Sequence, residues 1–276
     1  MQKLEVRAAD GSLIALTAQG AHLYSWQTPT GTDSQERLFL SRRSAFAEGK
    51  AIRGGVPVIF PQFSDFGPLP RHGFARTALW QVLQQGQDDA GNAIAELELR
   101  ANPATLAIWP YQFSLKLAVQ ANRRQLRLQL SVENTDTQAF SFSSALHSYF
   151  ALNELTNSRL QGLQGLHYLD NLLARQSFQE SAAELVISQE IDRVYQQAQQ
   201  PLLLQQAGHS LRISQQGFVD AVVWNPGASA AKLNDMELAE AEQMLCIEAA
   251  RIIEPVHLAA GASWTGEQLI ELLYPD

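Results

Sequence analysis

The chain contains 276 residues, of which 46% are hydrophobic and 17% are charged, and its formal net charge is -8. This length and apolar content can bury a sizeable core, either in one large all-β domain or in two smaller ones. The acidic balance disfavours binding to nucleic acid or to anionic membranes, so a small anionic ligand would need a local basic pocket.

The N-terminal segment and the cysteine content favour a cytoplasmic location. Residues 1–13 carry charges every few positions and lack the apolar stretch of a secretory signal. No stretch reaches the roughly 18 uninterrupted apolar residues of a membrane-spanning helix. Cys246 is the single cysteine, which excludes a disulfide within the chain and fits a reducing compartment.

Short segments of alternating apolar and polar residues dominate the chain. They cover residues 12–20, 79–85, 94–100, 113–120, 125–134, 139–150, 211–217, 218–226 and 244–252. Turn residues such as Asn225-Pro226-Gly227 bound most of them. Apolar residues at every second position are typical of antiparallel sheets with one face packed on the core and one face exposed to solvent. The pattern therefore predicts an all-β fold, a large antiparallel β-sandwich with a few short helices.

Helical signals are weak, and the best candidates lie at residues 41–46 and 234–243. The Gln-rich stretch 196–206 is expected to form a solvated loop and the edge of a strand. No linker rich in Pro, Gly or Ser divides the chain, and no repeat is visible. We therefore expect one domain over residues 1–276.

Residues 50–80 differ from the rest because Gly and Pro crowd them, which fixes the backbone in special turns. Binding groups are often carried by such loops on a rigid scaffold. The segment holds a group of cations, which comprises Arg53, Arg71, His72 and Arg76. The planar donors of arginine match a phosphate or a carboxylate. In an acidic protein this group indicates an anion site, although each residue could also be an ordinary surface arginine or a structural histidine.

His147 lies in the segment 139–150, where residues of one parity share a face. It shares its face with Ser141, Ser143, Ala145 and Tyr149, whereas Phe140, Phe142, Leu146 and Phe150 occupy the other. The first face is small and polar and suits the floor of a concave site. With an unperturbed pKa of about 6.5, His147 could act as an acid there, or it could be structural.

Glu248 lies in the segment 244–252, and both faces of this segment are apolar. A carboxylate buried there is costly unless it is paired or hydrogen-bonded. Glu248 could form a buried ion pair, with Arg251 as partner. Alternatively, it could be a general base whose pKa is raised toward neutrality by desolvation.

Asp192 could accept hydrogen bonds from sugar hydroxyls, although alone it could equally be a turn residue. Phe74, Trp80 and Trp224 could stack on a pyranose ring or pack in the core. Motifs for nucleotide binding, metal binding and serine hydrolysis are absent from the sequence, so we expect no cofactor and no metal.

Six motifs occur in a fixed order along the chain: KAIRGGVPVIFPQF (50–63), LPRHGFAR (69–76), ALHSYF (145–150), DRVY (192–195), VVWNPG (222–227) and CIEAA (246–250). In this order they resemble the hexose-6-phosphate mutarotases, or glucose-6-phosphate 1-epimerases, which are relatives of aldose 1-epimerase. The resemblance runs from about Ala51 to Trp264. It implies the galactose mutarotase-like fold, a supersandwich of antiparallel sheets with the site in an open groove.

The resemblance also implies roles for individual residues. His147 matches the family's catalytic histidine, the acid at the ring oxygen, and Glu248 matches the base at the anomeric hydroxyl. Arg53 and Arg76 match arginines associated with the substrate phosphate, and Asp192 matches a substrate-contacting aspartate.

Two further positions complete the implied substrate site, and one position departs from the family. His72 lies where relatives place a second site histidine, and Arg71 is a candidate anion contact at a position that varies. Ser64 follows FPQF where glycine is common.

The resemblance implies an enzyme that interconverts the anomers of a hexose 6-phosphate by acid/base ring opening and closure, with a small-molecule hexose phosphate as its only partner. We expect a monomer that binds no nucleic acid and no membrane. Three alternatives stay open: an aldose 1-epimerase acting on free sugars, a non-catalytic sugar-phosphate-binding module, and a glycoside hydrolase using Glu248 with Asp192.

Overall fold

The computed structural model describes residues 1–274, and it is built almost wholly from antiparallel strands. The predicted all-β fold is confirmed. A nine-stranded sheet contains β6 (Gln81–Gln87), β7 (Ala93–Arg100), β8 (Phe113–Ala121), β9 (Gln125–Asn134), β12 (Arg159–Gln161), β15 (Glu184–Leu185), β17 (Leu202–Gln206), β18 (His209–Gln216) and β21 (Ser263–Leu273). Its order is β15-β12-β17-β18-β21-β9-β8-β7-β6.

An eight-stranded sheet has the order β14-β13-β16-β19-β20-β10-β5, with β11 also paired to β20. Its strands are β5 (Val58–Ile59), β10 (Phe140–Leu146), β11 (Tyr149–Ala151), β13 (His167–Asp170), β14 (Gln176–Gln179), β16 (Ile191–Tyr195), β19 (Asp220–Asn225) and β20 (Met244–Leu258). A four-stranded sheet joins β1 (Lys3–Arg7), β2 (Leu13–Thr17), β3 (His22–Thr30) and β4 (Asp33–Glu36) in chain order.

Helical segments are short. The described residues contain one α-helix, α1 (Pro103–Ile108), and the 3₁₀ turns η1 (Ala75–Thr77), η2 (Leu155–Asn157), η3 (Asn171–Leu173), η4 (Gly227–Lys232) and η5 (Leu238–Gln243). Asn102 caps α1, since its side chain accepts from the N–H groups of Ala104 and Thr105. None of the helices within residues 1–274 has both the length and the apolar character needed to cross a membrane.

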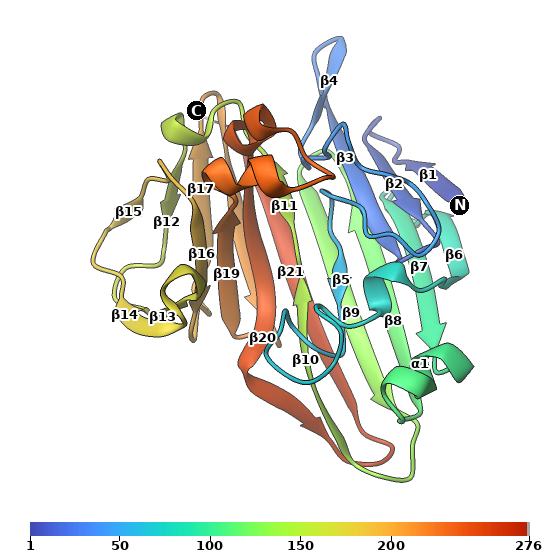
Figure 1. The fold of residues 1–276 in the computed structure, drawn as a ribbon. Helices are drawn as coiled ribbons and strands as arrows, with labels where there is room; N and C mark the ends of the chain where they lie inside the picture. The colour runs from blue at the N-terminus through green and yellow to red at the C-terminus, as the bar shows by residue number, and fades with distance from the viewer. Residues whose placement is uncertain (275–276) are drawn as a thin grey trace.

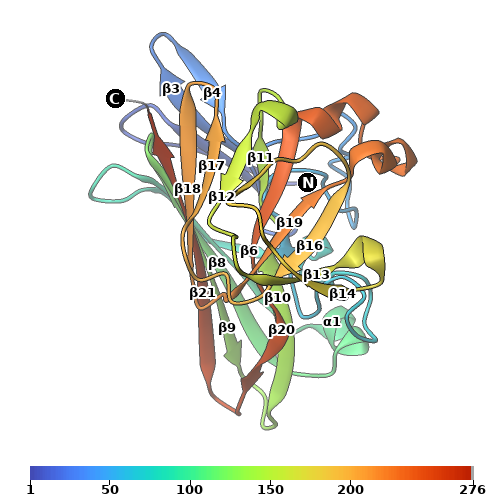
Figure 2. The ribbon, with the colours of Figure 1, turned by 90° about the vertical axis from the view of Figure 1, so that its left-hand side faces the viewer.

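The two large sheets pack face to face, as the side view in Figure 2 shows. The alternation in β9 explains this arrangement, because its apolar residues are buried while the residues between them face solvent. Strand β20 is buried on both faces: Leu245, Ile247 and Ala249 enter the main core, whereas Cys246 and Ala250 belong to smaller apolar clusters on the outer face. Glu248 has the parity of the outer face.

Loops cover this outer face of the eight-stranded sheet. In Figure 1 the segments around β5 cross in front of β10, and the orange coils of η4 and η5 lie above the upper part of β20. The Gly- and Pro-rich residues 50–80 contain only β5 and η1, as the sequence predicted.

Two local predictions were wrong. Residues 41–46 form no helix, because Ser41 and Ser44 use their hydroxyls in tertiary contacts with Glu240 and the backbone of Arg53. The Gln-rich segment contains the expected loop, but its strand β17 is not an edge, since it lies between β12 and β18. Between residues 234 and 243, helix is limited to η5.

Candidate active site

A pocket of about 240 Å³ opens on the outer face of the eight-stranded sheet. The seven residues singled out from the sequence all line it: Arg53, Arg71, His72, Arg76, His147, Asp192 and Glu248. They come from the Gly- and Pro-rich segment, from the junction of β10 and β11, and from strands β16 and β20. The fold therefore brings these distant motifs to one place.

His147 lies between the end of β10 and the start of β11, where its N–H donates to Pro57 O at 3.0 Å. Its imidazole is stacked on the ring of Tyr149, with centroids 4.8 Å apart and planes 10° from parallel. The rings of His72 and Trp224 contact it edge-on, at 5.7 Å and 6.0 Å. Aromatic groups therefore fix the imidazole plane, and His147 as a whole residue is 8% exposed.

Glu248 projects from the middle of β20 and is 1% exposed. Its Oε1 lies 3.3 Å from His147 Nε2, while its Oε2 is buried without a hydrogen-bond partner. The alternative pairing with Arg251 does not form, because Arg251 lies 3.8 Å from Glu254 instead. The carboxyl group and the imidazole thus face one another in the same pocket.

The protonation states of this pair follow from burial. Burial raises the pKa of Glu248 well above its ordinary value, and the nearby Asp192 adds to the effect. Burial also holds the pKa of His147 well below its ordinary value, with further contributions from His72, Arg53 and Arg76. Both shifts place the proton of the pair on Glu248, next to a neutral imidazole.

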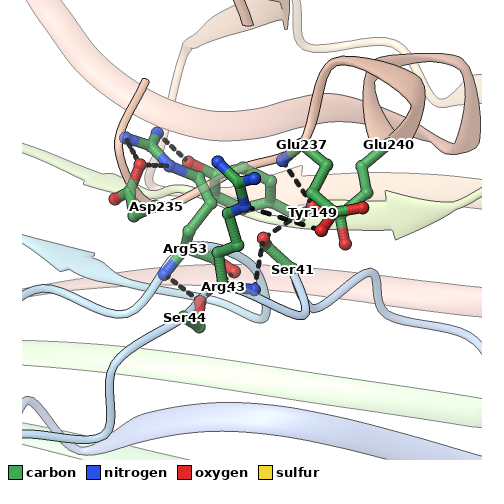
Figure 3. A network of polar contacts seen from close by, with 8 residues as sticks. All are labelled: Ser41, Arg43, Ser44, Arg53, Tyr149, Asp235, Glu237 and Glu240. Atoms are coloured by element: carbon green, nitrogen blue, oxygen red, sulfur yellow. Dashed lines mark hydrogen bonds and ion pairs between the residues drawn. The ribbon is translucent and has the colours of Figure 1, made fainter. Parts of the chain in front are cut away.

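Arg53 is the most firmly held cation in the pocket (Figure 3). Its Nε and Nη2 each lie 3.2 Å from Asp235 Oδ1, and its Nη1 donates to Tyr149 Oη at 3.1 Å. Ser44 fixes its backbone, since Ser44 Oγ accepts from Arg53 N and donates to Arg53 O. Tyr149 and Asp235 raise the pKa of Arg53 above its ordinary value despite burial, so the guanidinium stays charged.

Arg71 and Arg76 line the same pocket as Arg53. Arg76 Nη2 donates to Arg71 O at 3.2 Å, and burial lowers the pKa of Arg76 from its high ordinary value. Arginine side chains gathered in a pocket of an acidic protein create the local basic site that an anion requires.

His72 is a neutral member of this group. Burial lowers its pKa to about 2, and Arg76, Arg71 and Arg53 contribute. Its Nδ1 accepts from Ser64 N at 3.2 Å, so the neutral ring carries its proton on Nε2. Ser64 has φ +44°, in the left-handed region that explains why glycine suits this position, and the contact with His72 holds it there.

Asp192 belongs to strand β16 rather than to a turn. Its Oδ1 accepts from Asn171 Nδ2 at 2.7 Å, and burial raises its pKa. The sequence analysis missed Asn171, the first residue of η3, and Asp235, which lies in the loop between η4 and η5, because neither belongs to a recognisable motif. Tyr149 was placed correctly on the face of His147 but was not identified as a site residue. Its parity with His147 was the signal that could have found it.

The proposed aromatic stacking residues separate into two groups. Phe74 and Trp80 pack in the core between the sheets, whereas Trp224 lines the pocket. Residues 1–274 contain no cluster of three His, Cys, Asp or Glu side chains that could hold a metal ion. The arrangement offers one proton donor and one proton acceptor in contact, beside cations that suit a small anionic ligand.

The chain is similar to known proteins along nearly its whole length. The family model described as "Aldose 1-epimerase" matches residues 2–271. A protein of Cenchrus ciliaris is 34% identical over 96% of this chain and 83% of its own length, and one of Escherichia coli K12 is 31% identical over 87% and 83%. Both carry the name "Putative glucose-6-phosphate 1-epimerase".

Solved structures share the fold. A "putative mutarotase" of Salmonella typhimurium superposes with a TM-score of 0.89 at 27% identity, covering 99% of this chain and 90% of that one. A "galactose mutarotase-like protein" of Lactobacillus casei superposes with a TM-score of 0.77 at 15% identity, covering 98% and 100%. The expected galactose mutarotase-like fold is therefore confirmed.

Proposed function

This chain belongs to the aldose 1-epimerase family, and on that premise we propose that it interconverts the α and β anomers of hexose 6-phosphates, glucose 6-phosphate foremost. It is then an isomerase, and the residues that carry the reaction are His147 and Glu248. The observation that supports this most directly is the distance of 3.3 Å between His147 Nε2 and Glu248 Oε1 in one pocket.

That distance suits the chemistry of anomer exchange. Ring opening removes the proton of the C1 hydroxyl, breaks the bond between C1 and the ring oxygen, and protonates the ring oxygen. The aldehyde then rotates about the C1–C2 bond and closes on its other face. Because both oxygens are bonded to C1, the acceptor and the donor must lie close together, as Glu248 and His147 do.

The pair carries the one proton that this cycle needs. Glu248 takes the proton of the C1 hydroxyl as a carboxylate while His147 delivers one to the ring oxygen as an imidazolium. The proton that burial favours on Glu248 must therefore move to His147 before the ring opens. Closure on the opposite face reverses the two transfers, so the enzyme returns to its starting state without a net proton change.

The arginine group accounts for the phosphate. Arg53 and Arg76 line the pocket, and charge-assisted hydrogen bonds contribute roughly 1.5–3 kcal/mol each. Arg71 supplies a further cation, and Asp192 with Asn171 offers polar groups to the sugar hydroxyls. The substrate site is therefore a positively charged pocket in a protein whose net charge is -8.

We further propose that residues 1–276 form a single galactose mutarotase-like domain that works as a cytoplasmic monomer. The buried, unpaired Cys246 supports a reducing compartment, and the acidic net charge argues against nucleic-acid and membrane partners.

Substrate choice tests this proposal against an aldose 1-epimerase acting on free sugars. We expect Arg53→Ala and Arg76→Ala to raise KM for glucose 6-phosphate by about 10-fold or more, since 1.4 kcal/mol corresponds to a factor of 10. KM for free glucose should stay near the wild-type value. Arg127→Ala, which removes an exposed arginine paired with Glu267, serves as the matched control. Equal effects on both sugars would contradict the phosphate assignment.

A further inference from the structure

Tyr149 is the structural link between the cations and the catalytic imidazole. It is 2% exposed, and its backbone pairs with Cys246 of β20. Its ring is stacked on the imidazole of His147, and the ring of Phe39 lies 6.4 Å away from it, 25° from parallel. Trp224 contacts it edge-on at 6.0 Å. The plane of the imidazole is therefore set by the position of the phenol ring.

The hydroxyl of Tyr149 is hydrogen-bonded to Arg53, whose Nη1 donates to it at 3.1 Å (Figure 3). A guanidinium has five N–H groups. Asp235 accepts one of them, from Nε, and Tyr149 accepts another, from Nη1, while Nη2 also lies 3.2 Å from Asp235 Oδ1 in an ion pair. The guanidinium therefore keeps further N–H groups for a bound anion. An anion bound to Arg53 therefore contacts a side chain that also donates a hydrogen bond to Tyr149.

Electrostatics favours the same coupling. The titratable and charged groups around His147 are Glu248, His72, Arg53, Arg76 and the phenol of Tyr149. Burial keeps the imidazole neutral, and the arginines add to that preference. A dianion bound to Arg53 and Arg76 would offset their charges and stabilise the imidazolium that ring opening requires.

We propose that Tyr149 is a positioning residue that couples the anion pocket to His147, so that a phosphate dianion bound at Arg53 accelerates proton transfer at the sugar ring. The substrate phosphate then increases the rate of the reaction as well as the affinity for the substrate. This inference rests on the function proposed above and deepens it.

The experiment separates the anion from the sugar. Exchange between α- and β-glucose is measured by NMR with the full-length protein, with and without sulfate, and repeated with phosphite. Protein-free blanks are subtracted, because oxyanions catalyse mutarotation as general bases. We expect saturating sulfate to raise the protein-dependent rate by about 5-fold or more, the lower end of common coupling between sites. Inhibition by sulfate, or an unchanged rate, would overturn the proposal.

Two variants test the link itself. Tyr149→Phe keeps the ring and loses the hydroxyl, so the ratio of rates with and without sulfate should fall toward one. The part that remains is the charge effect of the dianion on His147, which does not pass through the hydroxyl. Tyr111→Phe, in the aromatic cluster with Trp109 and Phe140, is the control and should keep the wild-type ratio. A Tyr149→Phe protein that retains its melting temperature and the wild-type ratio would contradict the link.

Asp235→Asn provides a test that does not alter the rings. Without the charge of Asp235, Arg53 should bind sulfate more tightly. Because the guanidinium is then less firmly oriented, bound sulfate should accelerate glucose exchange less than in the wild type. Tighter binding with undiminished acceleration would count against the coupling. If the wild type accelerates glucose 6-phosphate exchange but ignores sulfate, only the coupling fails. If it accelerates neither sugar, the proposed function itself fails.

Discussion

The substitution Glu248→Gln should remove activity and at the same time change how stability depends on pH. The amide keeps the shape of the side chain and can still present an oxygen to His147 Nε2, which lies 3.3 Å from Oε1 in the wild type. It can no longer accept or donate a proton at neutral pH. Because general acid/base catalysis contributes about 10²–10⁴-fold, the exchange rate should fall by about that factor.

The stability effect follows from the raised pKa of Glu248, which burial causes. An unfolded glutamate ionises above about pH 4.3, whereas the folded carboxyl keeps its proton to higher pH. The folded state then binds more protons, so wild-type stability falls as pH rises from about 4.3 toward the folded pKa. The slope of this contribution approaches about 1.4 kcal/mol per pH unit.

Urea unfolding measures this contribution directly. The free energy of unfolding of Glu248→Gln minus that of the wild type should increase as the pH rises above about 4.3, and its slope should approach the value given above. Glu254→Gln, at an exposed residue near Arg251, is the control and should show a nearly constant difference. A constant difference for Glu248→Gln would mean that the folded carboxyl is ionised, and the account of the proton shared with His147 would be refuted.

Two further predictions concern stability and the shape of the pocket. Burial chiefly lowers the pKa of His22 to about 3 and that of His72 to about 2. The neutral form that the folded state favours therefore adds to the free energy of unfolding above about pH 6.5, and this contribution is lost as the pH falls toward the two folded values. Chemical unfolding should show a loss of about 2 kcal/mol per histidine at pH 5 relative to pH 8, and His22→Gln should lose less than the wild type. Gly55→Ala should raise KM for glucose 6-phosphate and lower the melting temperature. Gly55 closely follows Arg53 in the chain, and at φ +61° its Cβ would collide with the carbonyl oxygen of Leu23. Gly31→Ala, at φ +63° with open space around its Cβ, carries the backbone strain alone, so an equal loss in both variants would contradict the steric explanation.

The strands could be predicted because their pattern is local. In β9, residues 125–134 alternate so regularly that the predicted bounds match the observed ones. The helix predicted at residues 41–46 does not form, because the backbone there is held by contacts with the distant Glu240 and Arg53 rather than by neighbours in the sequence. The interior position of β17 likewise depends on its pairing with β12 and β18, which the surrounding glutamines do not indicate.

The members of the site were predictable as residue types in motifs, but their arrangement was not. Parity placed His147 and Tyr149 on one face, and the two apolar faces around Glu248 indicated its burial. The contact between His147 and Glu248 depends on the order of strands in a sheet, which no local pattern encodes. Asp235 reaches Arg53 from the loop between η4 and η5, for which the sequence offers no signal.

The most direct test of the mechanism is exchange NMR on equilibrated glucose 6-phosphate with the wild type and with His147→Ala. The reference is His167→Ala, which removes an exposed histidine of β13. The account predicts fast magnetisation transfer between the two anomers for the wild type and for His167→Ala, and transfer at the protein-free rate for His147→Ala. A wild type that leaves the exchange at the protein-free rate, or a His147→Ala protein as fast as the wild type, would contradict it.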